Sequence, residues 1–153
     1  MNTTRGKNFR RGERGAALLE FAIGATIFLT ATFAVLEVGR LLWIHNSLVD
    51  ATRRGARYAV NHDMGAQSLT EIQNMAVYGN TAGTGQPLVS DLKTTQVLVS
   101  YSNYELGAGT VTVTVDKYDF NFVLPLVSTK MRLPAYQTSL TAESAGYVPS
   151  TLP

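Results

Sequence analysis

The fold of this chain is decided by residues 15–38, which read GAALLEFAIGATIFLTATFAVLEV. Among the 21 residues from 16 to 36, here called the apolar run, only Glu20 carries a charge. A helix of that length spans roughly 31 Å, which matches one bilayer core. Apolar side chains fall on every face of this helix, unlike the single stripe of a surface helix. The stretch therefore predicts a transmembrane helix over about residues 16–38.

Charge is divided unevenly between the two sides of the apolar run. Five of the 13 basic residues precede it with one of the 11 acids, so the rest of the chain carries eight bases and ten acids. Positive flanks stay in the cytoplasm, so we expect residues 1–15 to form a basic cytoplasmic leader and residues 61–153 an extracytoplasmic domain. A secretory signal fits less well, because its apolar core is only about 7–15 residues long.

Composition excludes several kinds of chemistry. The chain has no cysteine, which removes disulfides, cysteine zinc sites and a thiol nucleophile. The two histidines, His45 and His62, lack the second ligand or partner motif that a metal or catalytic site requires. No phosphate-binding loop, nucleophile elbow or zinc motif occurs. We therefore expect a protein that is not an enzyme and that uses no cofactor and no metal.

The helical pattern continues beyond the apolar run. Apolar or small residues recur at three- and four-residue steps, the stripe of one helix face: Leu41, Ile44, Leu48, Ala51, Gly55 and Tyr58. No proline interrupts the stripe, so the sequence predicts one long helix over residues 16–60, beginning near Ala17. Trp43 falls just past the apolar run, where an interfacial aromatic side chain is expected.

The remaining residues predict a small domain with one helix and several strands. Ser68 and Glu71 match a capping box, which predicts a helix over residues 69–78. Residues 110–116 alternate strictly between threonine and valine, the pattern of a half-buried strand whose valines face the core. Three further strands are expected at residues 96–101, at residues 118–122 with their alternating aromatics, and at residues 136–143. Antiparallel strands covered on one face by the long helix would give an α+β fold.

Glu20 is the charged residue that needs an explanation. A carboxylate within a membrane span costs about 2.5–3.5 kcal/mol or more unless it is neutral or paired, so it is read as functional by default. The alternative is that Glu20 lies at the cytoplasmic edge and is solvated. Gly15 precedes Glu20 by five residues, and cleavage after Gly15 would leave Ala16 with a free amine. Such an amine on a neighbouring subunit would neutralise Glu20.

These residues resemble the N-terminus of type IV prepilins, in the order basic leader, Gly15, four mostly apolar residues, Glu20, Phe21 and a long apolar run. Two further stretches resemble the TadE-like pseudopilins of the tight-adherence (Tad or Flp) pilus system. They are Glu37-Val-Gly-Arg40 and residues 51–60, ATRRGARYAV. The alternating strand and its aromatic successor are also similar to that family.

The resemblance implies a pilin-like fold and a role as a minor pilin that supports initiation or assembly of a Tad-type pilus for adhesion. It implies cleavage between Gly15 and Ala16 by a prepilin peptidase. Its implied partners are that peptidase and other pilin or pseudopilin subunits, through Glu20 and Phe21, in the bacterial inner membrane. Many relatives carry a proline where this chain has Gly24-Ala25, and glycine weakens a helix less than proline does.

Seven residues of the helix are candidate partner contacts: Glu37, Arg40, Arg53, Arg54, Gly55, Arg57 and Tyr58. Glu37 and Arg40 also have a simpler interpretation as an exposed pair worth under about 1 kcal/mol. The arginines equally complement the dipole at the end of the helix, and without a broader basic field we do not expect nucleic acid binding. A glycine costs about 1 kcal/mol relative to alanine inside a helix, so Gly55 predicts close approach of another element.

A second hypothesis is a binding module of another class. In it the chain is an unprocessed single-pass membrane protein whose extracytoplasmic β domain recognises a ligand, and the spacing of Gly15 and Glu20 is coincidental. Substitution of Gly15 separates the two hypotheses, because only the pilin hypothesis predicts an uncleaved and inactive form.

Overall fold

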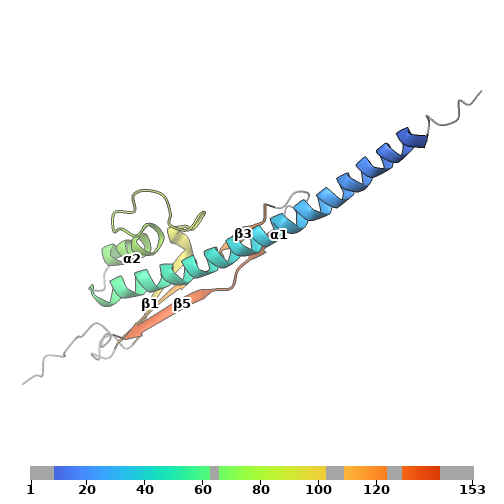
Figure 1. Ribbon diagram of the computed structural model, residues 1–153. Coiled ribbons are helices and arrows are strands. Elements are labelled where there is room, and N and C mark those ends of the chain that lie inside the picture. Colours follow the sequence, from blue (N-terminus) through green and yellow to red (C-terminus); the bar gives the residue numbers. More distant parts are fainter. Residues whose placement is uncertain (1–8, 63–65, 103–108, 124–128, 142–153) are drawn as a thin grey trace, which may run out of the picture. The chain divides into compact units, whose positions relative to one another are not determined.

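The computed structural model describes residues 9–62, 66–102, 109–123 and 129–141. The chain has an α+β fold in which a long N-terminal helix precedes a small antiparallel domain (Figure 1). Its elements are α1 (Phe9–Val60), α2 (Ala66–Tyr78), a short 3-10 turn η1 (Thr94–Gln96), β1 (Val97–Ser102), β2 (Thr110–Val115), β3 (Asp119–Asn121), β4 (Lys130–Arg132) and β5 (Tyr136–Thr141). The predicted fold class is thereby confirmed.

Helix α1 is continuous through both halves of the predicted helix and ends at Val60, as expected. The predicted start near Ala17 was wrong, because the helix begins at Phe9 and so includes the second half of the basic leader. That segment holds arginine and glutamate, which are good helix formers, and it contains no proline. The chain divides into two compact units, residues 1–40 with 122–129 and residues 41–121 with 130–153.

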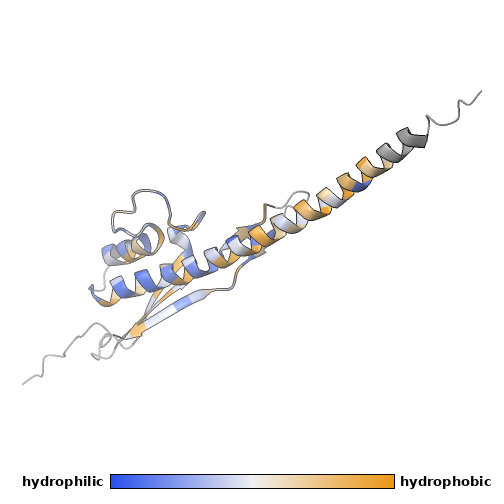
Figure 2. Cartoon of the chain, in the orientation of Figure 1, coloured by the Kyte–Doolittle hydropathy of each residue, from blue (hydrophilic) through white to orange (hydrophobic). Residues whose placement is uncertain are grey.

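In the first unit, the apolar run of α1 is exposed on all sides and appears orange in Figure 2. Leu18, Phe21, Phe28 and Val35 are each between 69% and 75% exposed. Of the described residues, only this helix is long and apolar enough to cross a membrane, with a mean hydropathy of 1.9 in its most apolar window. Length and composition therefore fit a membrane anchor.

In the second unit, a three-stranded antiparallel sheet of order β1-β2-β5 forms the centre. Val113 of β2 pairs with Val99 of β1 and with Thr138 of β5. The three valines of β2 are fully buried, as their alternation predicted. The helical stripe is buried in the same unit at Ile44, Leu48, Ala51 and Gly55. The hydrophobic core of the domain thus lies between α1 and one face of the sheet.

Two details show how closely α1 approaches the sheet. A methyl group on Gly55 would lie 3.2 Å from Val113 Cγ1 and 3.3 Å from Ala76 Cβ, so Gly55 permits the contact that its place in a helix suggested. The hydroxyls of Thr52 and Thr138 are 2.8 Å apart, and Thr52 is fully buried. This polar pair joins α1 to β5 inside the core.

Helix α2 ends at Tyr78 as predicted, but its expected beginning was wrong. The helix starts at Ala66, so Ser68 lies within it and is not a capping residue. Glu71 accepts a hydrogen bond from the hydroxyl of Tyr58 at 2.7 Å, so its carboxylate links two helices. The apolar side of α2 buries Ile72, Ala76 and Val77 in the domain core.

The strand expected at residues 118–122 is seen as the shorter β3, Asp119–Asn121, which pairs with β4 in a separate two-stranded sheet. Lys117 adopts a φ of 60°, a left-handed conformation that breaks the extended chain after β2. Asp116 accepts the Lys117 N–H at 2.8 Å and Gln96 donates to the Lys117 carbonyl at 2.7 Å, which hold this turn. Tyr118 and Phe120 are buried, as expected of core aromatics.

The other strand expectations hold where the structure describes them. The strands predicted at 96–101 and 110–116 correspond to β1 and β2. The last strand, expected over residues 136–143, is seen as β5 from Tyr136 to Thr141, and its final two residues lie outside the described part.

Candidate functional site

The first part of the candidate site surrounds Glu20 on α1. The residues three and four positions from it are Ala16, Ala17, Ile23 and Gly24, so its neighbours on that face are small except for Ile23. Glu20 is exposed, and a methyl group on Gly24 would meet nothing within 4 Å. Among the side chains that the structure describes, none forms an ion pair with Glu20. The carboxylate is therefore open to a group from outside the chain.

The predicted cleavage site lies in the same helix. Gly15 and Ala16 are both helical and exposed, and a methyl group on Gly15 would meet nothing within 4 Å. A peptidase can therefore reach this bond without displacing a side chain packed on Gly15. Because glycine favours the helix less than alanine by about 1 kcal/mol, Gly15 also makes local unwinding easier.

Polar groups within the apolar run are satisfied by the helix itself. The hydroxyls of Thr26, Thr30 and Thr32 donate to backbone carbonyls four residues earlier, at 2.8, 2.8 and 2.9 Å. Lipid offers no replacement partner for a hydroxyl, so such internal bonds lower the cost of placing threonine in a bilayer. Apart from Glu20, the apolar run is thus suited to an apolar environment.

Glu37 and Arg40 form an ion pair that is less exposed and has more hydrogen bonds than the sequence suggested. Arg40 donates from Nε and Nη2 to the two Glu37 oxygens at 3.2 and 2.7 Å. The backbone N–H of Val123 adds a third donor at 3.3 Å, and the Glu37 side chain is only 12% exposed. The sequence did not reveal Val123 as a partner, because 86 residues separate it from Glu37 and no pattern in the chain signals that pairing.

In the arginine-rich end of α1, some side chains face solvent and others contact the rest of the domain. Arg53 and Arg57 are exposed, with Arg53 3.8 Å from Asp50. Arg54 instead donates to the Ala76 carbonyl of α2 at 3.0 Å, and burial lowers its pKa. Gly55 is buried in the domain core. Arg53 and Arg57 are therefore the arginines of this segment that a partner can reach most easily.

Tyr58 closes this end of the helix against α2. Its hydroxyl donates to Glu71, and this hydrogen bond raises the pKa of Tyr58. The Tyr58 ring also stacks on His62, with ring centroids 3.8 Å apart. The three residues thus hold the helix end in place, and the sequence had treated Glu71 and His62 as unrelated to Tyr58.

His45 also has a partner that the sequence did not reveal. Its Nδ1 lies 2.9 Å from the Tyr136 hydroxyl, and the two rings meet edge to face at a centroid distance of 5.1 Å. Burial raises the pKa of Tyr136. Within the described residues, no group of three or more histidine or acidic side chains is placed to hold a metal ion.

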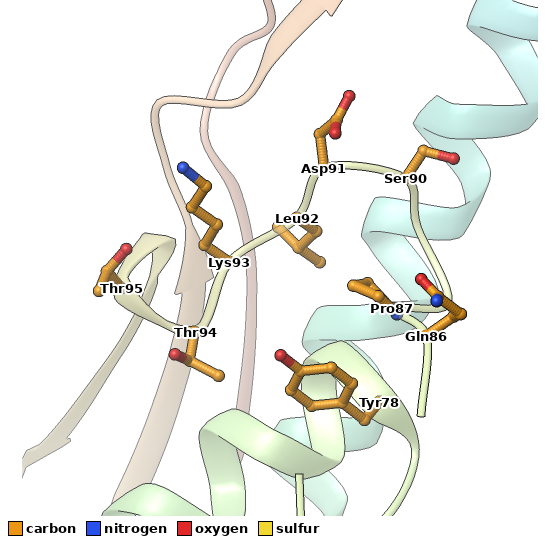
Figure 3. Close-up of a pocket in the computed structure, with 9 residues that line it drawn as sticks. All are labelled: Tyr78, Gln86, Pro87, Ser90, Asp91, Leu92, Lys93, Thr94 and Thr95. Atoms are coloured by element: carbon orange, nitrogen blue, oxygen red, sulfur yellow. The ribbon is translucent and has the colours of Figure 1, made fainter. Parts of the chain in front are cut away.

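The second compact unit also has an open pocket of about 740 Å³ between the end of α2 and residues 86–95 (Figure 3). The ring of Tyr78 lies at its base, with the hydroxyl directed into the space that the loop encloses. The charged ends of Asp91 and Lys93 point away from Tyr78. No motif in the sequence pointed to this pocket.

Comparison with known proteins supports the resemblance seen in the sequence. The family model described as TadE-like protein matches residues 15–57, which hold Gly15, Glu20, Glu37 and the arginine-rich end of α1. Neither the curated proteins nor the solved structures gave a match. Residues 15–57 are thus similar to TadE-like proteins, and the match includes the apolar run.

Proposed function

We propose that this chain is a minor pilin of a Tad-type pilus, released from its leader by a prepilin peptidase that cuts after Gly15. One observation carries the proposal: the TadE-like match includes the exposed apolar run, whose single charged residue, Glu20, stands five residues after Gly15. The proposed role is structural, in the initiation or assembly of the filament.

Before assembly, the apolar run spans the bacterial inner membrane. The basic leader keeps the N-terminus in the cytoplasm, and the domain that follows α1 lies outside. The exposed apolar side chains of the run need lipid or another apolar surface around them, because such a large apolar patch is unfavourable in water. Insertion in the membrane thus keeps the apolar run out of water until the subunit joins the pilus.

Cleavage changes what the helix can bind. It removes the leader with its five basic residues and creates an α-amine on Ala16. The helix then packs on helices of other subunits, and the amine of one subunit pairs with Glu20 of the next. Pairing matters because an unpaired carboxylate among apolar helices costs several kcal/mol. Ala16 and Gly24, one turn before and after Glu20, leave room for this contact.

Two substitutions test processing and assembly separately. Glu20→Gln keeps the size of the side chain and removes its charge, so we expect normal cleavage but loss of the subunit from isolated pilus-assembly complexes. Gly15→Leu should block cleavage and therefore also assembly. The control is Thr30→Val, which alters the exposed helix without changing its charge. Normal assembly of the Glu20→Gln subunit would contradict the proposed pairing.

The pocket beside Tyr78 favours a second role for the outer domain, as a binding module for a small ligand. The pocket combines the Tyr78 ring with polar side chains, Gln86, Ser90 and Thr94 among them, that offer hydrogen bonds to a small ligand. If the chain acts only as such an unprocessed module, Gly15→Leu leaves both its mass and its function unchanged. The same substitution therefore distinguishes the two roles.

A further inference from the structure

The Glu37 site also bears on how the outer part of the chain meets the membrane. From Ala16 to Glu37 the helix rises roughly 31 Å, about the thickness of the bilayer core. Glu37 therefore stands at the outer boundary between hydrocarbon and headgroups when the apolar run is inserted. Its three hydrogen bonds neutralise and satisfy the carboxylate at that level.

The hydrogen bond from Val123 to Glu37 fixes a second segment of the chain at the same depth. Both residues belong to the first compact unit, so this contact lies within one body. The Val123 side chain is 71% exposed although it is apolar. On either side of Glu37 in the sequence, Leu36 and Val38 are also exposed, at 62% and 53%. Exposed apolar side chains thus occur both at this end of the apolar run and on Val123, which binds Glu37.

A second hydrogen bond anchors this part of the chain. The N–H of Phe122, next to Val123, donates to the carbonyl of Thr129 at 3.0 Å.

We propose that Val123 is a second membrane contact, held by Glu37 against helix α1 so that its side chain enters the outer headgroup region of the same bilayer. The occupant is lipid, because Val123 is bound to Glu37, the residue that follows the exposed apolar run by one position. The proposal rests on membrane insertion of α1, which is part of the proposed function, and does not require pilus assembly.

The absence of cysteine from the sequence makes the test direct, since any single cysteine is a unique labelling site. The full chain is reconstituted in vesicles of phosphatidylethanolamine and phosphatidylglycerol after labelling of Val123→Cys with an environment-sensitive NBD dye. Phe28→Cys, in the apolar run, is the lipid reference, and Thr95→Cys, exposed on the outer domain, is the water reference. Lipids with nitroxide near the headgroup or deep in the acyl chain report depth.

We expect the Val123 label to be blue-shifted relative to the Thr95 label and quenched most by the shallow nitroxide. The Phe28 label should be quenched most by the deep nitroxide. If the Phe28 label is quenched but the Val123 label is not, the second contact is wrong, whether the Val123 emission is water-like or shielded by protein. If the Phe28 label is not quenched, membrane insertion itself fails, and with it both proposals.

Glu37→Ala tests the hydrogen bond that holds Val123. In the Val123→Cys background this substitution should lower shallow quenching, while quenching of a Phe28 label in a Glu37→Ala chain should stay the same. Unchanged quenching at Val123 would show that Glu37 does not set its depth.

Discussion

At the scale of single residues, Gly55 and Thr52 decide how α1 meets the domain. Gly55 brings the helix backbone within reach of Val113 and Ala76. Thr52 places a hydroxyl in the core and pairs it with Thr138. Both depend on close geometry, so small changes of side-chain volume or polarity should produce measurable changes in stability.

For Gly55 we predict destabilisation that increases with side-chain size. Gly55→Ala gains up to about 1 kcal/mol of helix propensity but incurs overpacking of about 1–3 kcal/mol against Val113 and Ala76. Gly55→Val should lose more. Gly39→Ala is the control, because its methyl group would meet nothing within 4 Å. Denaturant unfolding of the full chain in detergent measures the series. Equal stability of the valine variant and the parent would contradict the packing.

For Thr52 we predict a non-additive mutant cycle. Thr52→Val leaves the Thr138 hydroxyl without this partner and should cost about 1–2 kcal/mol. The double variant with Thr138→Val removes both polar groups and should recover part of that loss. Unfolding free energies of the two single variants and the double variant give the coupling. Strict additivity would show that the two hydroxyls do not stabilise each other.

Whether the sequence could predict the roles of these residues depends on how far apart in the chain their contact partners lie. Periodicity identified Gly55 as unusual, because a glycine in a helix interior is locally unfavourable. It also predicted the buried valines of β2. The Thr52–Thr138 pair and the Val123 bond to Glu37 were not predictable, since each joins positions 86 residues apart in sequence. Such pairs depend on the order of the strands and on the course of the connecting loops, and a local sequence pattern reveals neither.

At the scale of elements, the junction of α1 and α2 depends on Tyr58 and Glu71. The sequence read Glu71 as part of a capping box, because the Ser68 spacing satisfied that local rule. In the structure α2 begins at Ala66, and the Glu71 carboxylate accepts a hydrogen bond from the Tyr58 hydroxyl. A tertiary hydrogen bond thus replaced a local one. The same limit applies after β2, where the turn at Lys117 separates β2 from β3 although the alternating pattern continues through both.

This junction predicts a loss of stability at alkaline pH. The hydrogen bond to Glu71 raises the pKa of Tyr58, so its stabilisation is fully present below the unfolded tyrosine pKa of about 10 and is lost as pH rises through the folded pKa. Glu71→Gln should lower the Tyr58 pKa. Ultraviolet titration of tyrosinate, with Tyr58→Phe to assign the signal, measures it. An unchanged titration in Glu71→Gln would contradict the link between the helices.

At the scale of the whole molecule, the chain combines an exposed apolar helix with a small domain that covers the second half of α1. This combination was predictable, because hydropathy, charge asymmetry and helical periodicity extend over long stretches and reinforce one another. The antiparallel strands followed from their alternation, whereas the order β1-β2-β5 was not accessible from the sequence. Gly15 and Glu20 were recognised by their spacing, and their role stays a proposal.

The measurement that tests this role most directly is the intact mass of the protein from membranes, with and without a prepilin peptidase. We predict a chain that begins at Ala16 only when the peptidase is present. Gly15→Leu should then keep the full mass in both samples, while Glu20→Gln should still be cut. A parent chain that begins at Met1 in both samples would leave no free amine for Glu20 and would contradict the pilin account.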